Sequence, residues 1–219
     1  MPENATQSQP FERLPSGRHG LTRETVLASQ RGRLLDAMVQ IVTEKGYADT
    51  TVSDVVERAG VSRRTFYELF PDKEACFLAS YDTGVEIMLG RLRSAIRSVP
   101  RADWRARARA AVTTYMDVLA EEPNFAWALH VSIVGAGPAA LARRAQMLGL
   151  FGEIWGRLHL VARAEDPLRP ELSAAALRAM AGGMEELVRE RLRTHGARSL
   201  PGYADDVLRA ALQLLGDAD

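Results

Sequence analysis

The sequence predicts an all-α protein, with an N-terminal three-helix head that contains a helix-turn-helix and a larger C-terminal helical bundle. Three observations support this fold class. Apolar residues recur at spacings of three and four along most of the chain. Glycine and proline separate these periodic segments. No segment shows strand-like alternation bounded by hairpin turns.

The first helix is indicated by a repeat of buried-type residues, and Gly46 ends it as a C′ glycine does. The repeat consists of Leu34, Leu35, Met38, Ile41 and Val42. Before this helix, residues 1–22 contain scattered proline and glycine without a period, which is typical of a mobile arm.

Two short helices follow, each with a capping residue. Thr51 caps the first, with Asp54 as its capping-box partner, and Gly60 ends it. Ser62 caps the second, whose buried side we expect at Phe66, Leu69 and Phe70. Asp72 then caps a fourth helix. Beyond it, helices are expected near 72–98, 102–121, 124–134, 138–163, 170–195 and 202–216.

Composition excludes several function classes. The 28 Lys and Arg balance 28 Asp and Glu, so any contact with nucleic acid needs a local basic patch. A single cysteine excludes a disulfide framework, and four scattered histidines lack the paired spacing of metal ligands. We therefore expect no metal and no cofactor. The cysteine, Cys76, is expected to serve packing, with redox sensing as the alternative.

One uncharged segment, 123–142, invites comparison with a membrane span. A span needs about 20 apolar residues in unbroken helix. The glycines and proline of residues 135–138 would break this one, so we interpret it as a buried core helix. The polar first ten residues show no secretory signal. The sequence therefore predicts no membrane partner.

The stretch from Thr51 to Phe70 has the spacing of a helix-turn-helix, with a tight turn at residues 59–62. A major groove admits one helix, and arginine at the N-terminal end of that helix bonds guanine edges in bidentate fashion. Arg63 and Arg64 are thus candidate base-contacting residues. The candidates that position the helix on phosphate or complete the contact are Tyr47, Thr50, Thr51, Ser62, Thr65, Tyr67 and Lys73.

Residues 31–81 resemble the DNA-binding head of the TetR family of bacterial transcriptional regulators. The resemblance lies in Gly46-Tyr47, Thr50-Thr51, residues 59–62, residues 65–67, Phe70 and Lys73-Glu74. It implies a homodimer on a near-palindromic operator, with an unknown small-molecule effector that releases the DNA, in the bacterial cytoplasm and on the nucleoid when bound to DNA. The expected domains are a basic arm (1–22), a DNA-binding head (23–75) and a ligand-binding and dimerisation domain (76–219).

A long N-terminal arm departs from the family pattern. It and its junction with the first helix carry Arg13, Arg18, His19 and Arg23. Basic arms can enter a neighbouring minor groove, and a solvated tail is the alternative.

Aromatic and methionine side chains gather on three consecutive predicted helices. Such sets, with one or two polar groups, are typical of adaptable small-molecule pockets, and plain core is the alternative. The candidate pocket residues are Tyr115, Met116, Phe125, Trp127, His130, Met147, Phe151 and Trp155.

Small residues on the penultimate helix and a leucine stripe on the last one suit a self-complementary dimer surface, with an intramolecular core as the alternative. The candidates are Ala175, Ala179, Gly182, Gly183, Leu208, Ala211, Leu212 and Leu215.

Seven arginines crowd one predicted helix junction, at positions 91, 93, 97, 101, 105, 107 and 109. An anionic ligand group and a solvated charged face are both compatible with them, the solvated face being the default.

Two rival functions stay open at this point. One is a DNA-binding regulator without an effector, organised by dimerisation alone. The other is an enzyme that uses the loop Gly135-Ala136-Gly137 as a nucleotide or flavin fingerprint, although the strands and the acidic residue that such a site needs are missing from the pattern. The sequence distinguishes neither repressor from activator nor one effector from another.

Overall fold

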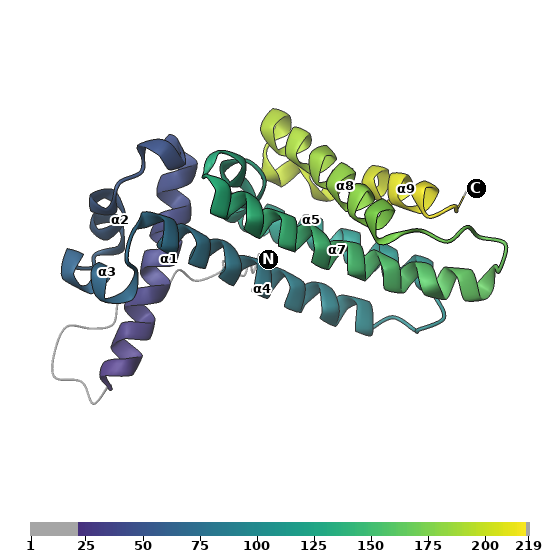
Figure 1. Cartoon of the computed structure of the whole chain (residues 1–219), viewed down its shortest axis with the longest axis horizontal. Coiled ribbons are helices and arrows are strands. Elements are labelled where there is room, and N and C mark those ends of the chain that lie inside the picture. The colour runs from purple at the N-terminus through teal and green to yellow at the C-terminus, as the bar shows by residue number, and fades with distance from the viewer. Residues whose placement is uncertain (1–21, 218–219) are drawn as a thin grey trace, which may run out of the picture. The chain divides into compact units, whose positions relative to one another are not determined.

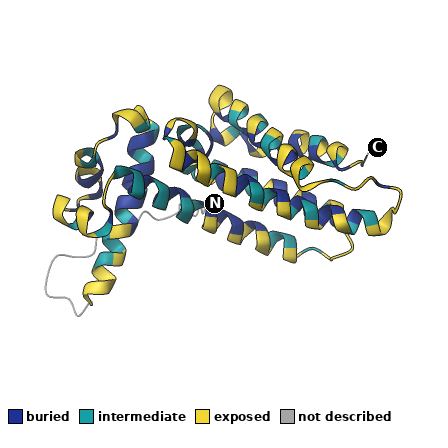
Figure 2. Cartoon of the chain, viewed as in Figure 1, coloured by how far each residue is buried: buried dark blue, intermediate teal, exposed yellow. Residues whose placement is uncertain are grey.

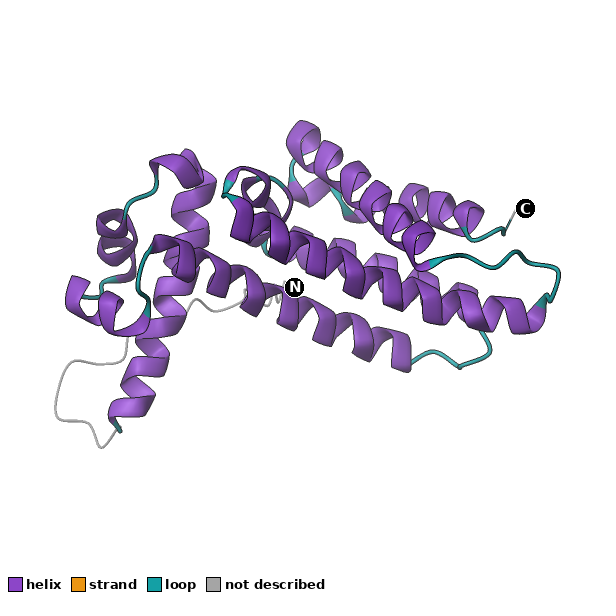
Figure 3. Cartoon of the chain, in the orientation of Figure 1, coloured by secondary structure: helices purple, strands orange, loops and turns teal. Residues whose placement is uncertain are grey.

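The computed structural model describes residues 22–217, and over this range the backbone forms helices and loops without a strand (Figure 3). The predicted all-α fold class is confirmed. The expected arm, apart from Thr22, lies outside the described residues. The chain divides into two compact units, Met1–Tyr81 and Asp82–Asp219. The division falls after Tyr81, whereas we expected it after Ala75; both positions lie within one helix.

Unit 1 contains α1 (Arg23–Asp49), α2 (Val52–Ala59), α3 (Arg63–Leu69) and the start of α4 (Lys73–Arg97) (Figure 1). Gly46, at φ 82°, interrupts α1, so the regular helix ends there as predicted and one further turn leads to Thr50. Each predicted cap is present: the Thr51 and Asp54 capping box on α2, Ser62 on α3, and Asp72, whose Oδ1 accepts from the Ala75 amide at 2.8 Å.

The core of unit 1 forms where α1, α3 and α4 bury their apolar stripes (Figure 2). Leu34, Met38, Phe66 and Phe77 are fully buried. Cys76 is buried with them, and burial raises the pKa of its thiol to about 12. A thiol that is protonated and enclosed at neutral pH serves packing, in agreement with the preferred interpretation.

Unit 2 is a helical bundle in which α7 packs along α8, and α5 contacts α6, α7 and α9. Its elements after α4 are α5 (Trp104–Glu121), α6 (Pro123–His130), η1 (Ser132–Gly135), α7 (Pro138–Glu165), α8 (Ala174–His195), η2 (Ala197–Ser199), η3 (Pro201–Tyr203) and α9 (Ala204–Leu214). Within residues 22–217, no helix is both long enough and apolar enough to cross a membrane.

Several predicted helices of unit 2 are shorter than expected, and two of them show the physical reason. The helix predicted over 124–134 ends at His130 and continues as the 3₁₀ turn η1, because the chain tightens before Gly137, whose φ is 101°. The helix predicted from residue 170 begins at Ala174, because the Ser173 side chain caps it by accepting from the Ala176 amide.

Candidate DNA-binding and effector sites

The turn between α2 and α3 has the left-handed geometry that only glycine adopts readily. Gly60 lies at φ 60° and ψ 41°, and the amide of Val61 donates to the carbonyl of Val56 at 3.0 Å. Phe66 is fully buried and Phe70 is 5% exposed, so both side chains hold α3 against the core as predicted. The opposite side of α3 faces solvent.

The exposed side of α3 carries two arginines and a tyrosine. Arg63 is exposed, and the side chain of Arg64 is 88% exposed while its Nε donates to Glu68 at 3.1 Å. Tyr67 is 53% exposed and stands edge-on to Phe66, with ring centroids 5.4 Å apart. An arginine pair at the start of a recognition helix, with an aromatic side chain one turn later, matches the geometry of direct base contact.

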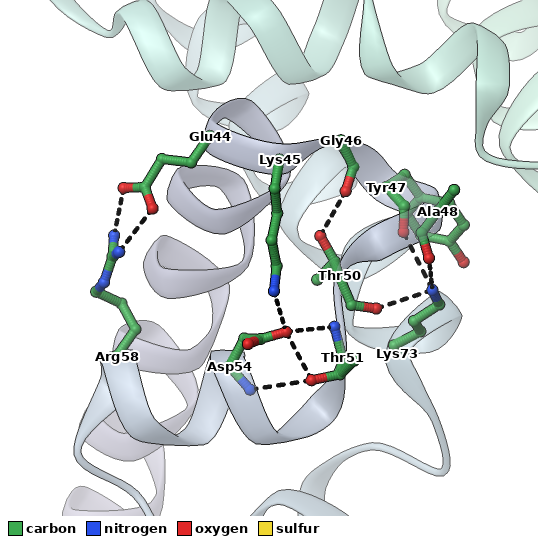
Figure 4. Close-up of polar contacts among 10 residues, drawn as sticks. All are labelled: Glu44, Lys45, Gly46, Tyr47, Ala48, Thr50, Thr51, Asp54, Arg58 and Lys73. Carbon is green, nitrogen blue, oxygen red and sulfur yellow. Dashed lines mark hydrogen bonds and ion pairs between the residues drawn. The ribbon is translucent and has the colours of Figure 1, made fainter.

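Three candidate hydroxyls are engaged in capping. The Ser62 hydroxyl accepts from the Thr65 amide at 3.0 Å and lies 2.9 Å from the Thr65 hydroxyl. The Thr51 hydroxyl donates to Asp54 at 2.6 Å and accepts from the Asp54 amide at 3.3 Å (Figure 4). Ser62 and Thr51 are exposed and Thr65 is half-buried, and their hydrogen bonds fix the starts of α3 and α2.

Thr50 and Lys73 have hydrogen-bond partners inside unit 1, and the phosphate contacts expected of them stay a prediction. Thr50 is 1% exposed, and its hydroxyl donates to the Gly46 carbonyl at 2.7 Å. The Lys73 ammonium donates to the carbonyls of Tyr47, Ala48 and Thr50 at 3.1, 3.1 and 2.9 Å (Figure 4). An ammonium has three donors, so these carbonyls occupy all of them. The orphan carbonyls at the end of a helix attract a cation, and α1 supplies them here.

Tyr47 completes this arrangement. Its ring lies 4.7 Å from the Lys73 ammonium and 5.0 Å from the Phe77 ring. Partial burial, with Glu74 and Asp72 nearby, raises the pKa of its hydroxyl, so the tyrosine stays neutral.

Two ion pairs between α1 and α2 were not predicted from the sequence. Arg58 pairs with Glu44 at 2.7 Å, and Lys45 pairs with Asp54 at 2.5 Å (Figure 4). The hydrogen bonds of Asp54 with Lys45 and Thr51 hold the pKa of this carboxyl well below its usual range. No periodic signal marks these pairs, because their partners lie in different helices. They fix the orientation of α2, on which α3 rests.

In unit 2, four of the eight candidate pocket residues line one cavity: Tyr115, Met147, Phe151 and Trp155. The remaining wall is mostly aliphatic, with Glu185 as its charged member. The cavity volume is about 40 Å³, room for about three waters. Sites for drug-sized ligands measure about 300–1,000 Å³, so this cavity has to open before it holds one.

The other four candidates lie outside this lining. Met116 and His130 are fully buried. Trp127 is half-buried. Phe125 is half-buried over Gly84, where an added Cβ would lie 2.0 Å from the phenylalanine ring.

His130 belongs to a buried polar network behind the cavity. Its Nε2 lies 3.0 Å from the Tyr115 hydroxyl, and its Nδ1 lies 3.9 Å from Glu185, beyond hydrogen-bond distance. Glu185 pairs with Arg144 and Arg189, and the Nε of Arg189 donates to the His130 carbonyl at 2.8 Å. Burial, with Arg189 and Arg144 nearby, lowers the pKa of His130 to about 3. The imidazole is therefore neutral.

A second, larger cavity of about 610 Å³ lies between α4, α5 and α7. Five arginines and one glutamate line it, together with seven aliphatic residues. Ile154 of α7 lines both cavities. On α4, Leu92 lines the aromatic cavity, and Leu89 and Arg93 line the larger one. Four of the seven crowded arginines line this cavity: Arg93, Arg97, Arg101 and Arg107. Arg91, Arg105 and Arg109 instead form ion pairs with Glu121, with Asp217 and Glu165, and with Asp205.

The candidate dimer residues fall into two groups. Ala175, Ala179 and Gly183 are exposed on α8, and an added Cβ at Gly182 or Gly183 meets open space. Leu208, Ala211 and Leu215 are buried inside unit 2, because α9 packs its apolar stripe against α5 and α8. The last three residues are thus core of this chain, a correction to the expectation that they form an open surface. Leu212 is half-buried.

The glycine-rich loop Gly135-Ala136-Gly137 joins η1 to α7, with Pro138 in the first turn of α7. A dinucleotide fingerprint requires a strand before the loop, and here a 3₁₀ turn precedes it. Among the described side chains, no group of three or more histidine, cysteine or acidic residues is arranged to hold a metal ion.

Comparison with known proteins agrees with this geometry. Residues 34–80 match the family model of bacterial regulatory proteins of the tetR family. A curated relative, the HTH-type transcriptional activator FasR of Mycolicibacterium smegmatis, is 30% identical over 108 residues. That match covers 49% of this chain and 48% of the relative, so the similarity spans about half of the relative's length.

Two solved structures share the fold over most of the chain. The fatty acid degradation regulator FadR of Bacillus halodurans has a TM-score of 0.75 at 20% identity, covering 85% of this chain and 95% of the other. FadR of Bacillus subtilis in complex with stearoyl-CoA has a TM-score of 0.73 at 19% identity, covering 85% and 98%.

The helix-turn-helix is that of a class of DNA-binding proteins, and the curated relatives that the chain matches are transcription regulators and not enzymes, which speaks against the nucleotide- or flavin-dependent alternative. The N-terminal unit gives the more particular likeness: its residues 34–80 are similar to the DNA-binding domain of the tetR family of bacterial regulatory proteins.

Proposed function

We propose that this protein is a homodimeric, sequence-specific DNA-binding repressor that a small, mostly apolar ligand releases from a near-palindromic operator. The observation that carries the DNA-binding part is the exposed face of α3. Arg63, Arg64 and Tyr67 point to solvent from a short helix whose other side is anchored by Phe66 and Phe70. This arrangement leaves one helix face available to a major groove. The place of action is then the nucleoid of a bacterial cell.

The proposed residue roles follow from their surroundings. Arg63 and Arg64 contact base edges, and Tyr67 reaches a phosphate or a thymine methyl. Ser62, Thr65 and Thr51 hold the helix starts, whose amides favour phosphate. Tyr47 and Lys73 brace the end of α1.

The effector site is proposed at the aromatic cavity of unit 2. Tyr115, Phe151, Trp155 and Met147 supply an apolar lining, and the Tyr115 hydroxyl supplies a polar group. An acyl chain suits this lining. The structurally similar FadR of Bacillus subtilis was solved in complex with stearoyl-CoA. Since the cavity measures about 40 Å³, ligand entry requires a rearranged bundle. Such a rearrangement is what a two-state switch needs, because a ligand acts only through its different affinity for the two states.

Helix α4 is the proposed link between ligand and DNA. It is continuous from Lys73 to Arg97, and the division between the units falls within it. Leu92 of α4 lines the aromatic cavity, and Lys73 of α4 holds the end of α1. A displacement of α4 therefore reaches the DNA-binding unit through one continuous element.

A regulator without an effector is the alternative that the small cavity favours. The test is a titration of operator DNA with the protein, in the presence and absence of candidate apolar ligands. Release of DNA by a ligand that binds unit 2 supports the proposal. Binding of DNA that no ligand in a broad acyl and aromatic panel alters supports the alternative. Reporter assays with the site inside or upstream of a promoter separate repressor from activator.

A further inference from the structure

We infer that the aromatic cavity of unit 2 recognises a small, uncharged aromatic molecule that carries a hydroxyl group, as a phenol does. This inference rests on the effector site proposed above and adds the chemical class of its ligand. Tyr115 and Glu185 of the lining supply oxygen atoms that accept a hydrogen bond from the hydroxyl group. Phe151 and Trp155 supply aromatic surface for the ring.

The Tyr115 hydroxyl is bonded to a neutral histidine. Its oxygen lies 3.0 Å from Nε2 of His130, and burial, with Arg189 and Arg144 nearby, lowers the pKa of this imidazole to about 3. A neutral imidazole carries a single N–H, on either Nδ1 or Nε2. The direction of the hydrogen bond at Nε2 therefore depends on which nitrogen holds the proton, and the surroundings of Nδ1 decide this.

Nδ1 of His130 lies near a carboxylate. It is 3.9 Å from Oε1 of Glu185, and it has no hydrogen-bond partner among the described residues. A carboxylate attracts an N–H and repels the lone pair of a ring nitrogen, and in a buried site water does little to screen the difference. The proton is thus on Nδ1. Nε2 is then the acceptor, and the Tyr115 hydroxyl is the donor in their hydrogen bond.

A tyrosine hydroxyl that gives its proton to a histidine can only accept from a ligand, because it has one hydrogen and two lone pairs. Glu185 is also an acceptor, since its carboxylate is paired with Arg144, whose Nε donates at 2.9 Å. Tyr115 and Glu185 are the two oxygen-bearing side chains of the lining. The ligand therefore needs a donor, an O–H or an N–H, on its polar end.

A charge of either sign on the ligand is disfavoured. Arg144 and Arg189 pair with Glu185 and do not line the cavity, so a ligand carboxylate would face the Glu185 carboxylate without a guanidinium group of its own. A ligand ammonium group would face a carboxylate that two guanidinium groups already balance. A buried ion without a partner is costly, whereas a neutral hydroxyl group needs only hydrogen bonds.

The indole N–H of Trp155 suits the oxygen of the same hydroxyl group. Trp155 lines the cavity and is 3% exposed, and within residues 22–217 its N–H has no hydrogen-bond partner. A hydroxyl group donates and accepts at once. It can therefore donate to Tyr115 or Glu185 and accept from an indole, which matches both kinds of polar group in the lining.

The apolar part of the lining favours a single ring over a long chain. Tyr115 and Phe151 are in edge-to-face contact, with ring centroids 5.3 Å apart, and Trp155 lines the same cavity. Aromatic rings gain from such contacts beyond the area that they bury. The cavity measures about 40 Å³, so a one-ring molecule requires a smaller opening of the bundle than a long chain does.

The test measures the binding of three probes to the full chain by calorimetry: p-cresol, toluene and p-toluate. All three contain the same methyl-substituted ring, and the group opposite the methyl is a hydroxyl, a hydrogen or a carboxylate. The variant Y115F removes the Tyr115 oxygen. The matched control Y203F removes the hydroxyl of a half-buried tyrosine outside the lining. Circular dichroism and operator affinity confirm that each variant is folded.

We expect wild type to bind p-cresol about tenfold more tightly than toluene, and to bind p-toluate more weakly than either. Y115F should lose about tenfold in affinity for p-cresol and keep its affinity for toluene within about twofold, because toluene makes no hydrogen bond to the missing oxygen. Y203F should bind all three probes as wild type does. Nitrogen-15 NMR, with H130Q to assign the signals, should show the His130 proton on Nδ1.

Four results would overturn the inference: no preference of wild type for p-cresol over toluene, tighter binding of p-toluate than of p-cresol, unchanged p-cresol affinity in folded Y115F, or a His130 proton on Nε2. Three of these use the wild-type protein, so they decide the question even if Y115F does not fold. Failure of the proposed function is a different result: protein that binds p-cresol in this way yet keeps its operator, or that binds no operator at all.

Discussion

The Lys73 ammonium lies 2.9 Å from the carbonyl oxygen of Thr50, and it also bonds the carbonyls of Tyr47 and Ala48. Lys73 is the first residue of α4, and these carbonyls belong to the last turn of α1 and the residue after it. Lys73 therefore links the start of α4, which continues into unit 2, to the end of α1.

Replacing Lys73 by methionine should lower the free energy of unfolding by about 2 kcal/mol, because three carbonyls no longer have a charged donor. Since the ammonium is fully occupied, the slope of operator affinity against salt should stay near the wild-type value. Urea denaturation and salt titrations measure the two quantities. K45M, which removes the more exposed ion pair with Asp54, is the matched control. A slope reduced by about one would restore Lys73 as a phosphate contact.

Replacing Arg64 by alanine should weaken operator binding by about 1–3 kcal/mol and relax preference at one base pair, because alanine cannot form the bidentate bonds to a base edge. In the free protein, the Nε of Arg64 donates to the Glu68 carboxylate at 3.1 Å. E68Q should therefore strengthen DNA binding, since it removes both a competing partner and a negative charge near phosphate. Gel-shift titrations against operator and scrambled DNA measure both effects. Unaltered base preference in R64A would contradict the assigned role.

Stability should fall as the pH drops from about 6.5 towards 3, in part through His130. Burial beside Arg189 and Arg144 lowers the pKa of this imidazole to about 3, from 6.5 in the unfolded chain. Between these values the unfolded state binds a proton that the folded state does not, so acid favours unfolding. H130Q should flatten this part of the pH–stability curve in urea titrations. The H195Q control concerns an exposed histidine and should leave the curve unchanged.

Ligand entry should be reported by Trp155 and not by Trp127, because Trp155 lines the aromatic cavity and Trp127 lies outside its lining. W155F should abolish the change in tryptophan emission on titration with an effector, while W127F keeps it. Trp104, the first residue of α5, is fully buried and lies outside the lining of this cavity, so it should add a constant background to the emission. An emission change that survives in W155F would place the ligand elsewhere.

Gly183→Trp should convert a dimer into a monomer at micromolar concentration, since the exposed face of α8 is the proposed contact between two copies. Space around Gly183 is open within one chain, so the fold should survive the substitution. Gly90→Trp is the matched control, at an exposed and equally open position on α4. Sedimentation distinguishes the two states. Wild type that sediments as a monomer would refute the dimer.

The sequence was most informative where local chemistry decides the structure. The capping pattern of Thr51 and Asp54, the helix end at Gly60 and the buried Phe66 and Phe70 were all predicted, because each depends on neighbours within a few residues. The same local determinants carry the family resemblance of the DNA-binding unit.

The proposed effector region illustrates the opposite case. Aromatic spacing on three helices identified Tyr115, Phe151 and Trp155, but it did not distinguish them from Phe125 or Trp127, because helical periodicity gives a face and not its partner. Leu208 and Leu215 show the same ambiguity, since an apolar stripe suits a dimer surface and a core equally well.

By itself, then, the sequence determined the all-α fold class, the caps of α2, α3 and α4 and the helix-turn-helix motif, since backbone hydrogen bonding and capping act over a few residues. Only the tertiary structure decided that Lys73 bonds the end of α1, that Arg97 and Arg157 line one cavity, and that Ile154 lines both this cavity and the aromatic one. These relationships join residues from different helices, and packing of the whole bundle brings them together.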